Sequence, residues 1–213
     1  MNRFAKQKKH ALNKLNVSIR VGDTDKEIVP LLNAINSLQD YYTTSSCAGR
    51  IQLFNDLGSK IRNNSIACWH RKVSPGEVVK EVKAVKPPHL HKGFIPDPRR
   101  GEGVSGILYF KCEPPILHIA ARDIESAGKL LNTAREAGFK HSGIQAIKPE
   151  RVIVELISTE TIDAPIMEKD GKLISDEYIR YLAKLANKKY MKSQAKIKKL
   201  ERKIKELGKP DKT

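Results

Sequence analysis

The end of the chain has the pattern that most restricts its fold, because apolar residues recur every three or four positions between residues 175 and 207. Ser175 can cap a helix at this point, and Gly208 ends the pattern. We therefore predict one long basic helix with an apolar seam. Its first turns are expected to pack on a core, and its last three to project as a basic arm or a weak homodimer contact. The seam consists of Ile179, Ala183, Ala186, Tyr190, Ser193, Ile197, Leu200, Ile204 and Leu207.

Upstream of this helix, runs of β-branched and aromatic residues predict strands. The strands are expected near 40–44, 50–54, 65–72, 106–113, 116–121, 143–147 and 152–157. Helices are expected over 4–15, over 24–38 with Thr24 as cap, and over 124–137 between Asp123 and Gly138. This order predicts an α+β protein with a mixed β-sheet packed by helices. Residues 1–174 are expected to form the main α+β domain, and 175–213 the long basic C-terminal helix.

The charge of the chain indicates its partner. Its 213 residues carry a formal net charge of +16, and twelve Lys or Arg stand against three acids between Lys184 and Lys212. Contact with phosphate is the natural interpretation, although a solvated helix face explains a charge run equally well. No run of eighteen apolar residues exists, so no membrane partner is expected. The three cysteines are far apart in sequence, which predicts free thiols and a cytoplasmic location.

Residues 74–103 are rich in proline and glycine and predict a loop excursion of the kind that forms binding loops. This segment holds Arg99 and Arg100. Residues 101–106 match the letters G-x-G-x-x-G, but they follow a Pro-rich loop and open a strand. A dinucleotide fingerprint must follow a strand and open a helix, so a Rossmann-type site is not supported.

The string from Tyr41 to Arg50 begins as a strand and ends in small hydroxyl side chains, a thiol, a glycine and a guanidinium. Small side chains let a ligand approach the backbone, and Gly49 permits a turn that a side chain would block. Arg50 can bind a carboxylate or phosphate at two points. A structural turn needs only the glycine, so we predict that this string is functional.

A second cluster runs from Lys111 to His118. Lys111 and Glu113 lie on one face of a predicted strand, two prolines force a bend, and His118 follows on the next strand. A lysine, a carboxylate and an imidazole near a bend can serve proton transfer or ligand recognition. The alternatives are a surface ion pair and a core histidine.

Three further residue types leave alternatives open. Trp69 can stack on a base or adenine, or fill the core. The cysteines match no zinc spacing, so no metal is expected, and buried structural thiols are the common case. Cys47 with His70 or His118 can also form a nucleophile pair, as in a cysteine-dependent hydrolase.

Four segments together resemble the tRNA wybutosine-synthesising protein 3 family. They are Ser45 to Arg50 (SSCAGR), Trp69, Tyr109 to Ile119 (YFKCEPPILHI) and Ala137 to Ile144 (AGFKHSGI). The resemblance covers about residues 1–185 and implies an S-adenosylmethionine-dependent methyltransferase outside the Rossmann fold. It implies methylation of N4 of the tricyclic 4-demethylwyosine-type base at position 37 of tRNA-Phe. The family usually has serine where this chain has Ala48.

Roles can then be assigned as hypotheses. S-adenosylmethionine is expected to contact Ser45, Ser46, Cys47, Gly49, Arg50 and Trp69. Glu113 or His118 is expected to accept the proton or orient the base. tRNA phosphates and the base are expected to contact His70, Arg99, Arg100, Lys111, His141, Ser142, Gly143, Lys188, Lys192 and Lys199. A non-catalytic basic RNA-binding protein is the main alternative.

Overall fold

The computed structural model describes residues 3–58, 63–85, 106–168 and 170–209. The chain forms two compact units, each with its own sheet and core. Unit 1 comprises residues 1–49, 114–160 and 191–213, and unit 2 comprises residues 50–113 and 161–190. Arg99 and Arg100 lie outside the described residues. Within the described ranges, no helix combines the length and apolar content needed to span a membrane.

The sheet of unit 1 has four antiparallel strands in the order β1-β5-β7-β6. Their bounds are β1 (Tyr41–Cys47), β5 (Ile116–Ala121), β6 (Gly143–Lys148) and β7 (Arg151–Ile157). Its helices are α1 (Arg3–Val21), α2 (Val29–Ser37), α4 (Ile124–Ala137) and the last part of α5 (Asp176–Leu207).

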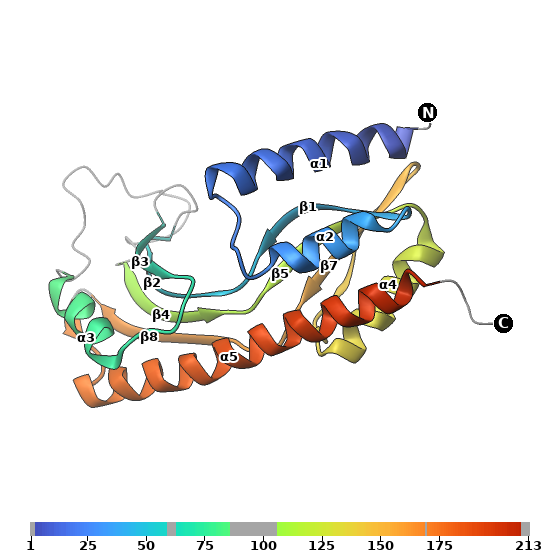
Figure 1. Ribbon diagram of the computed structural model, residues 1–213. Helices are drawn as coiled ribbons and strands as arrows, with labels where there is room; N and C mark the ends of the chain where they lie inside the picture. The colour runs from blue at the N-terminus through green and yellow to red at the C-terminus, as the bar shows by residue number, and fades with distance from the viewer. Residues whose placement is uncertain (1–2, 59–62, 86–105, 169, 210–213) are drawn as a thin grey trace. The chain divides into compact units, whose positions relative to one another are not determined.

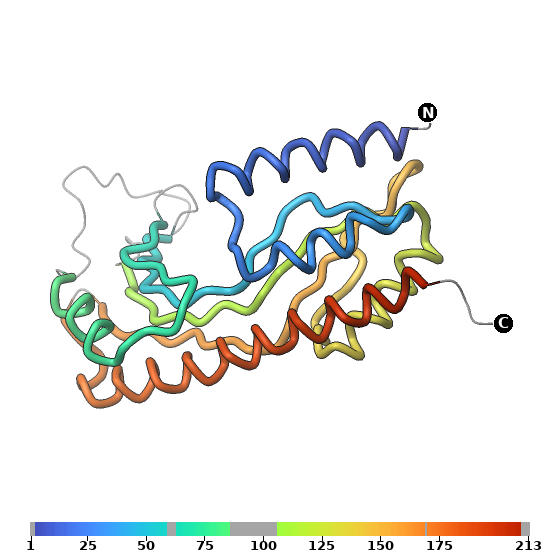
Figure 2. Tube along the Cα trace, in the orientation of Figure 1, coloured from blue at the N-terminus to red at the C-terminus, as the bar shows by residue number. Residues whose placement is uncertain are grey.

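The two faces of this sheet differ in what covers them, because side chains alternate along a strand. Leu117 and Val154 belong to the core that α2, α4 and the end of α5 complete. On the opposite face, Phe4 of α1 packs on Tyr42, with ring centroids 5.1 Å apart. Helix α1 runs alongside β1 on this second face (Figures 1 and 2). The face under α1 is therefore only partly filled by apolar side chains.

Unit 2 contains an antiparallel sheet in the order β3-β2-β4-β8-β9. The strands are β2 (Arg50–Asp56), β3 (Asn64–Trp69), β4 (Ile107–Glu113), β8 (Ile162–Glu168) and β9 (Gly171–Lys172). Helix α3 (Pro75–Ala84) starts with a capping box in which Ser74 and Glu77 satisfy each other's backbone N–H. It packs in the unit 2 core with the first turns of α5.

Helix α5 confirms the predicted seam and corrects its predicted use. Ser175 Oγ accepts from the Tyr178 N–H at 3.2 Å, as expected of a cap. Ile179 and Ala183 are buried in the unit 2 core, and Leu200 and Ile204 in the unit 1 core. The expectation that the last turns project was wrong, because burying these apolar side chains within the chain removes them from water. The same burial leaves no exposed seam there for a homodimer.

The other predictions about the fold have mixed outcomes. The α+β class without a Rossmann-like parallel sheet is confirmed, with two antiparallel sheets in place of one mixed sheet. Helix α4 has the predicted bounds: Asp123 Oδ1 accepts from the Ser126 N–H at 2.8 Å, and Gly138 ends the helix at φ 101°. Thr24 is not a cap, because its hydroxyl bonds that of Ser18 at 2.8 Å and α2 begins later. Strands β8 and β9 were not predicted.

Candidate active site

A row of polar side chains crosses the α1 face of the unit 1 sheet. Ser45 on β1 pairs in register with His118 on β5, which pairs with Glu155 on β7. Ser45 Oγ lies 3.0 Å from His118 Nδ1, and His118 Nε2 lies 2.9 Å from Glu155 Oε1. Gln145 Nε2 donates to Glu155 Oε2 at 2.8 Å. Ser45 and His118 belong to separate sequence motifs, and the pairing of β1 with β5 brings them together.

The hydrogen-bond partners of His118 indicate which of its ring nitrogens carries the proton. The Glu155 carboxylate only accepts, so His118 Nε2 is the donor in that bond. In the neutral imidazole Nδ1 is then an acceptor, and the Ser45 hydroxyl donates to it. The side chain of Glu155 is 17% exposed and that of His118 is 33% exposed. The row is therefore an oriented imidazole with a carboxylate behind it and an exposed hydroxyl in front.

Glu155 was missed by the sequence analysis although a signal was present. It is the one acid within an apolar strand, Arg151–Ile157, whose residues alternate between buried and half-buried. An acid at such a position faces away from the main core, so it marks the polar face of the sheet. His118 has both ring nitrogens engaged by Ser45 and Glu155, and the hypothetical Cys47–His118 pair is not formed.

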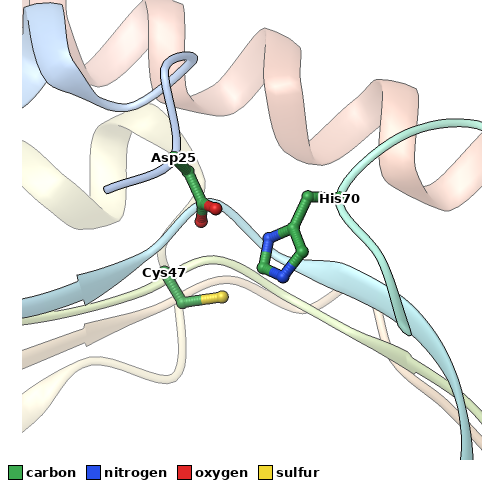
Figure 3. A group of neighbouring side chains, drawn as sticks. All are labelled: Asp25, Cys47 and His70. Atoms are coloured by element: carbon green, nitrogen blue, oxygen red, sulfur yellow. The ribbon is translucent and has the colours of Figure 1, made fainter. Parts of the chain in front are cut away.

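The turn after β1 is held by two side chains that hydrogen-bond to its backbone. Figure 3 shows the Asp25 carboxylate near the end of β1 that carries Cys47. Asp25 Oδ2 accepts from the Ala48 N–H at 2.7 Å, and Gln194 Nε2 donates to the Ala48 carbonyl at 3.0 Å. Ala48 is fully buried, so a serine hydroxyl there would need a buried partner. Gly49 has φ 89°, which confirms that the turn requires a glycine.

In unit 2 the structure brings Arg50 and Glu113 together. They are register partners on β2 and β4, and Arg50 Nε donates to Glu113 Oε2 at 2.6 Å. Their side chains are 40% and 36% exposed. Lys111, on the same face of β4 as Glu113, pairs with Asp163 at 3.0 Å. Glu113 thus orients the Arg50 guanidinium, and a role as proton acceptor would compete with that ion pair.

Three other residues predicted for the site contact neighbouring residues of the fold. Trp69 is 8% exposed in the unit 2 core, and its Nε1 donates to Glu77 at 3.0 Å, which favours the core alternative over stacking. His70 Nε2 lies 3.6 Å from Cys68 Sγ (His70 is also labelled in Figure 3). Ser142 is 7% exposed and donates to the Phe139 carbonyl at 2.7 Å, so it fixes the loop.

The remaining predicted residues are accessible. His141 is exposed, and Gly143 is the register partner of Glu155. Lys188, Lys192 and Lys199 are exposed on α5. Of all the predicted residues, the structure therefore groups Ser45 with His118 in unit 1, and Arg50 with Glu113 in unit 2.

An α+β fold without a Rossmann-like parallel sheet places the protein outside the common dinucleotide-binding class. The carboxylate-held imidazole on the α1 face has the chemistry that acid–base catalysis needs. The sequence profile of the family described as Methyltransferase TYW3 matches residues 6–206. The chain belongs to this methyltransferase family, and the resemblance found in its sequence is confirmed.

Similar proteins match over nearly the whole chain. One from Pyrococcus abyssi (strain GE5 / Orsay), named tRNA(Phe) 7-((3-amino-3-carboxypropyl)-4-demethylwyosine(37)-N(4))-methyltransferase 1, is 37% identical over 206 residues, covering 96% of this chain and 97% of that protein. The enzyme of Methanocaldococcus jannaschii with the same name but no final numeral is 34% identical, covering 97% and 99%. The solved structure of PH1069 protein from Pyrococcus horikoshii has a TM-score of 0.81 at 36% identity, covering 94% and 95%.

Proposed function

We propose that this chain transfers a methyl group from S-adenosylmethionine to N4 of 7-(3-amino-3-carboxypropyl)-4-demethylwyosine at position 37 of tRNA(Phe). Its family and the names of its relatives support this tRNA methyltransferase role in wybutosine synthesis. The observation in this chain that carries the chemistry is the row Ser45–His118–Glu155. In this proposal the row is the proton acceptor, and the exposed Ser45 is its contact with a base of the folded RNA.

The residues of the row have separate tasks in the proposed reaction. When bound, S-adenosylmethionine supplies a methyl group on a sulfonium carbon, and N4 must lose a proton as it gains that group. Ser45 Oγ accepts the proton from N4 while its own proton passes to His118 Nδ1. Glu155 holds the imidazole in the required tautomer and stabilises the imidazolium that forms. Ser45 and His118 are the catalytic residues, and Glu155 is a positioning residue.

The cofactor requires a group that binds its carboxylate, and Arg50 has the right chemistry. A guanidinium binds a carboxylate at two points through parallel N–H donors. The bond from Nε to Glu113 fixes the guanidinium plane on an exposed part of unit 2. We assign Arg50 the carboxylate of S-adenosylmethionine, with Glu113 as its positioning residue. The exposed Lys188, Lys192 and Lys199 are assigned to tRNA phosphates. The three cysteines are thiols and not disulfides, which accords with a cytoplasmic reaction.

Replacing Arg50 with alanine is expected to weaken S-adenosylmethionine binding by about 10- to 100-fold, the loss that accompanies removal of a charge-assisted hydrogen bond. Isothermal titration calorimetry measures this directly. Arg71→Ala is the matched control, because Arg71 forms a comparable ion pair with Glu77 in the same unit at 2.6 Å. Equal cofactor affinity in the Arg50 variant and the wild type would remove Arg50 from the cofactor site.

The function itself is tested with tRNA(Phe) that carries the 4-demethyl precursor, incubated with the protein and S-adenosylmethionine labelled in its methyl group. Digestion and tandem mass spectrometry should find one labelled methyl group on N4 of the position 37 nucleoside. Label on another atom or nucleoside would contradict the proposal. Salt-sensitive tRNA binding without any transfer would favour the non-catalytic RNA-binding alternative.

A further inference from the structure

Helix α1 has an unusual charge composition. Its nineteen residues include no Asp or Glu, while six are Lys or Arg: Arg3, Lys6, Lys8, Lys9, Lys14 and Arg20. Two of these cations have structural tasks. Arg3 pairs with Glu150 at 2.7 Å, and Lys8 donates to the Leu38 carbonyl. These bonds, with Phe4 packed on Tyr42, fasten the first turns of the helix to unit 1.

A groove of about 630 Å³ lies between α1 and β1, lined entirely by residues of unit 1. Lys6, His10 and Lys14 line it from the helix at intervals of four residues, so they share one side of α1. All three are exposed, and within the described part of the chain none of them forms an ion pair. Arg151 lines the groove from β7. The wall of the groove is therefore positively charged, and no acid among the described residues pairs with Lys6 or Lys14.

The floor of the groove connects it to the candidate active site. Thr44, Ser45 and Ser46 line it from β1, and Ser45 is the residue whose hydroxyl reaches His118. The hydroxyl groups of the floor can donate hydrogen bonds to phosphate oxygens. The lysines of the wall attract the negative charge of the same phosphates. When a base is bound at the Ser45–His118–Glu155 row, the RNA strand on either side of that base is therefore within reach of the groove.

The spacing of the cations favours a strand of phosphates over a single carboxylate. Lys6 and Lys14 are eight residues apart on the helix, so their positive charges are separated by about 12 Å along its axis, with His10 halfway between them. One carboxylate contacts one or two such side chains, whereas successive phosphates of an RNA strand meet cations repeated along a line. The one acid that lines the groove, Asp23, lies beyond the end of α1.

We propose that the groove between α1 and β1 binds consecutive phosphates of the RNA strand next to the methylated base, with Lys6 and Lys14 as the principal contacts. The proposal rests on the proposed function in taking tRNA as the substrate. In this proposal helix α1 positions the RNA strand.

The double variant Lys6→Ala/Lys14→Ala tests this assignment. Its affinity for unmodified tRNA(Phe) should fall about 10-fold, and the slope of log affinity against log salt should become shallower by about 1.4–1.8, the value for two lost phosphate contacts. Lys9→Ala/Arg20→Ala is the matched control: it removes two exposed charges from the same helix, outside the groove. The control should change the slope by well under one phosphate contact, and both variants should keep the wild-type melting temperature and S-adenosylmethionine affinity.

Equal losses of tRNA affinity in the two variants would show diffuse attraction by α1 and overturn the groove assignment. Weaker S-adenosylmethionine binding in the groove variant, with tRNA binding intact, would overturn it in favour of a cofactor site. Because tRNA binding is measured without catalysis, the result stands apart from the methylation assay. If the groove variant fails to fold, the single variant Lys14→Ala gives the same comparison with about half the change in slope.

Discussion

Methyl transfer by the His118→Asn variant is expected to be at least about 100-fold slower than by the wild type, the range in which positioned general bases contribute. Asparagine keeps a polar side chain of similar reach but cannot take up a proton. The Ser45 hydroxyl then has no acceptor for its proton while N4 is losing its own. Single-turnover rates with saturating tRNA and S-adenosylmethionine isolate the chemical step from binding.

The positioning role of Glu155 is tested by a second variant with a smaller expected loss of rate. Glu155→Gln retains the shape of the side chain but loses the charge that stabilises the imidazolium, so its rate should fall between those of wild type and His118→Asn. Glu125→Gln is the matched control, since Glu125 is an exposed acid on α4 that pairs with Lys129 one turn along its own helix. Affinities for tRNA and S-adenosylmethionine should be unchanged in all three. A wild-type rate in His118→Asn would exclude the row as the proton acceptor.

Replacing Leu200 with alanine is expected to lower the free energy of unfolding by about 2–5 kcal/mol. Leu200 is fully buried in the unit 1 core, and truncation removes apolar contacts and leaves a cavity. Urea or guanidinium denaturation, followed by circular dichroism, measures the change. Lys198→Ala, two residues away on an exposed position of α5, should change stability by less than about 0.5 kcal/mol.

The same variant separates the two uses that the α5 seam allows. If Leu200 packs within its own chain, the loss of stability does not depend on protein concentration. If the seam were a dimer contact, Leu200→Ala would weaken self-association in sedimentation equilibrium and leave the stability of the single chain nearly unchanged. The second pattern would contradict the buried position of Leu200.

The residues of the candidate site differ in how visible they are in the sequence. Local patterns identified Ser45 and His118 as candidates, because hydroxyls after a strand and a histidine in an apolar strand are visible without tertiary information. They did not identify Glu155, which joins His118 only through the antiparallel register of β5 and β7. A shift of one residue in that register would turn Glu155 to the other face. The chemistry of the row therefore depends on long-range strand pairing.

Signals confined to a few neighbouring residues were sufficient for the elements they govern. Asp123 and Gly138 predicted both ends of α4, because a cap and a left-handed glycine act within one helical turn. The periodicity of α5 predicted its length and its buried face in the same way, and the SSCAGR and KCEPP segments predicted the family.

Which partner each buried face meets was decided only by the tertiary structure. The seam of α5 has the same pattern whether it contacts another chain or its own, and the fold buries Leu200 and Ile204 in the unit 1 core. The sequence likewise allows Trp69 to be a stacking residue or a core residue, and only the structure shows that it lies in the unit 2 core. Spacing along the chain selects the face of an element that avoids water, whereas the identity of the covering surface depends on residues far away in sequence.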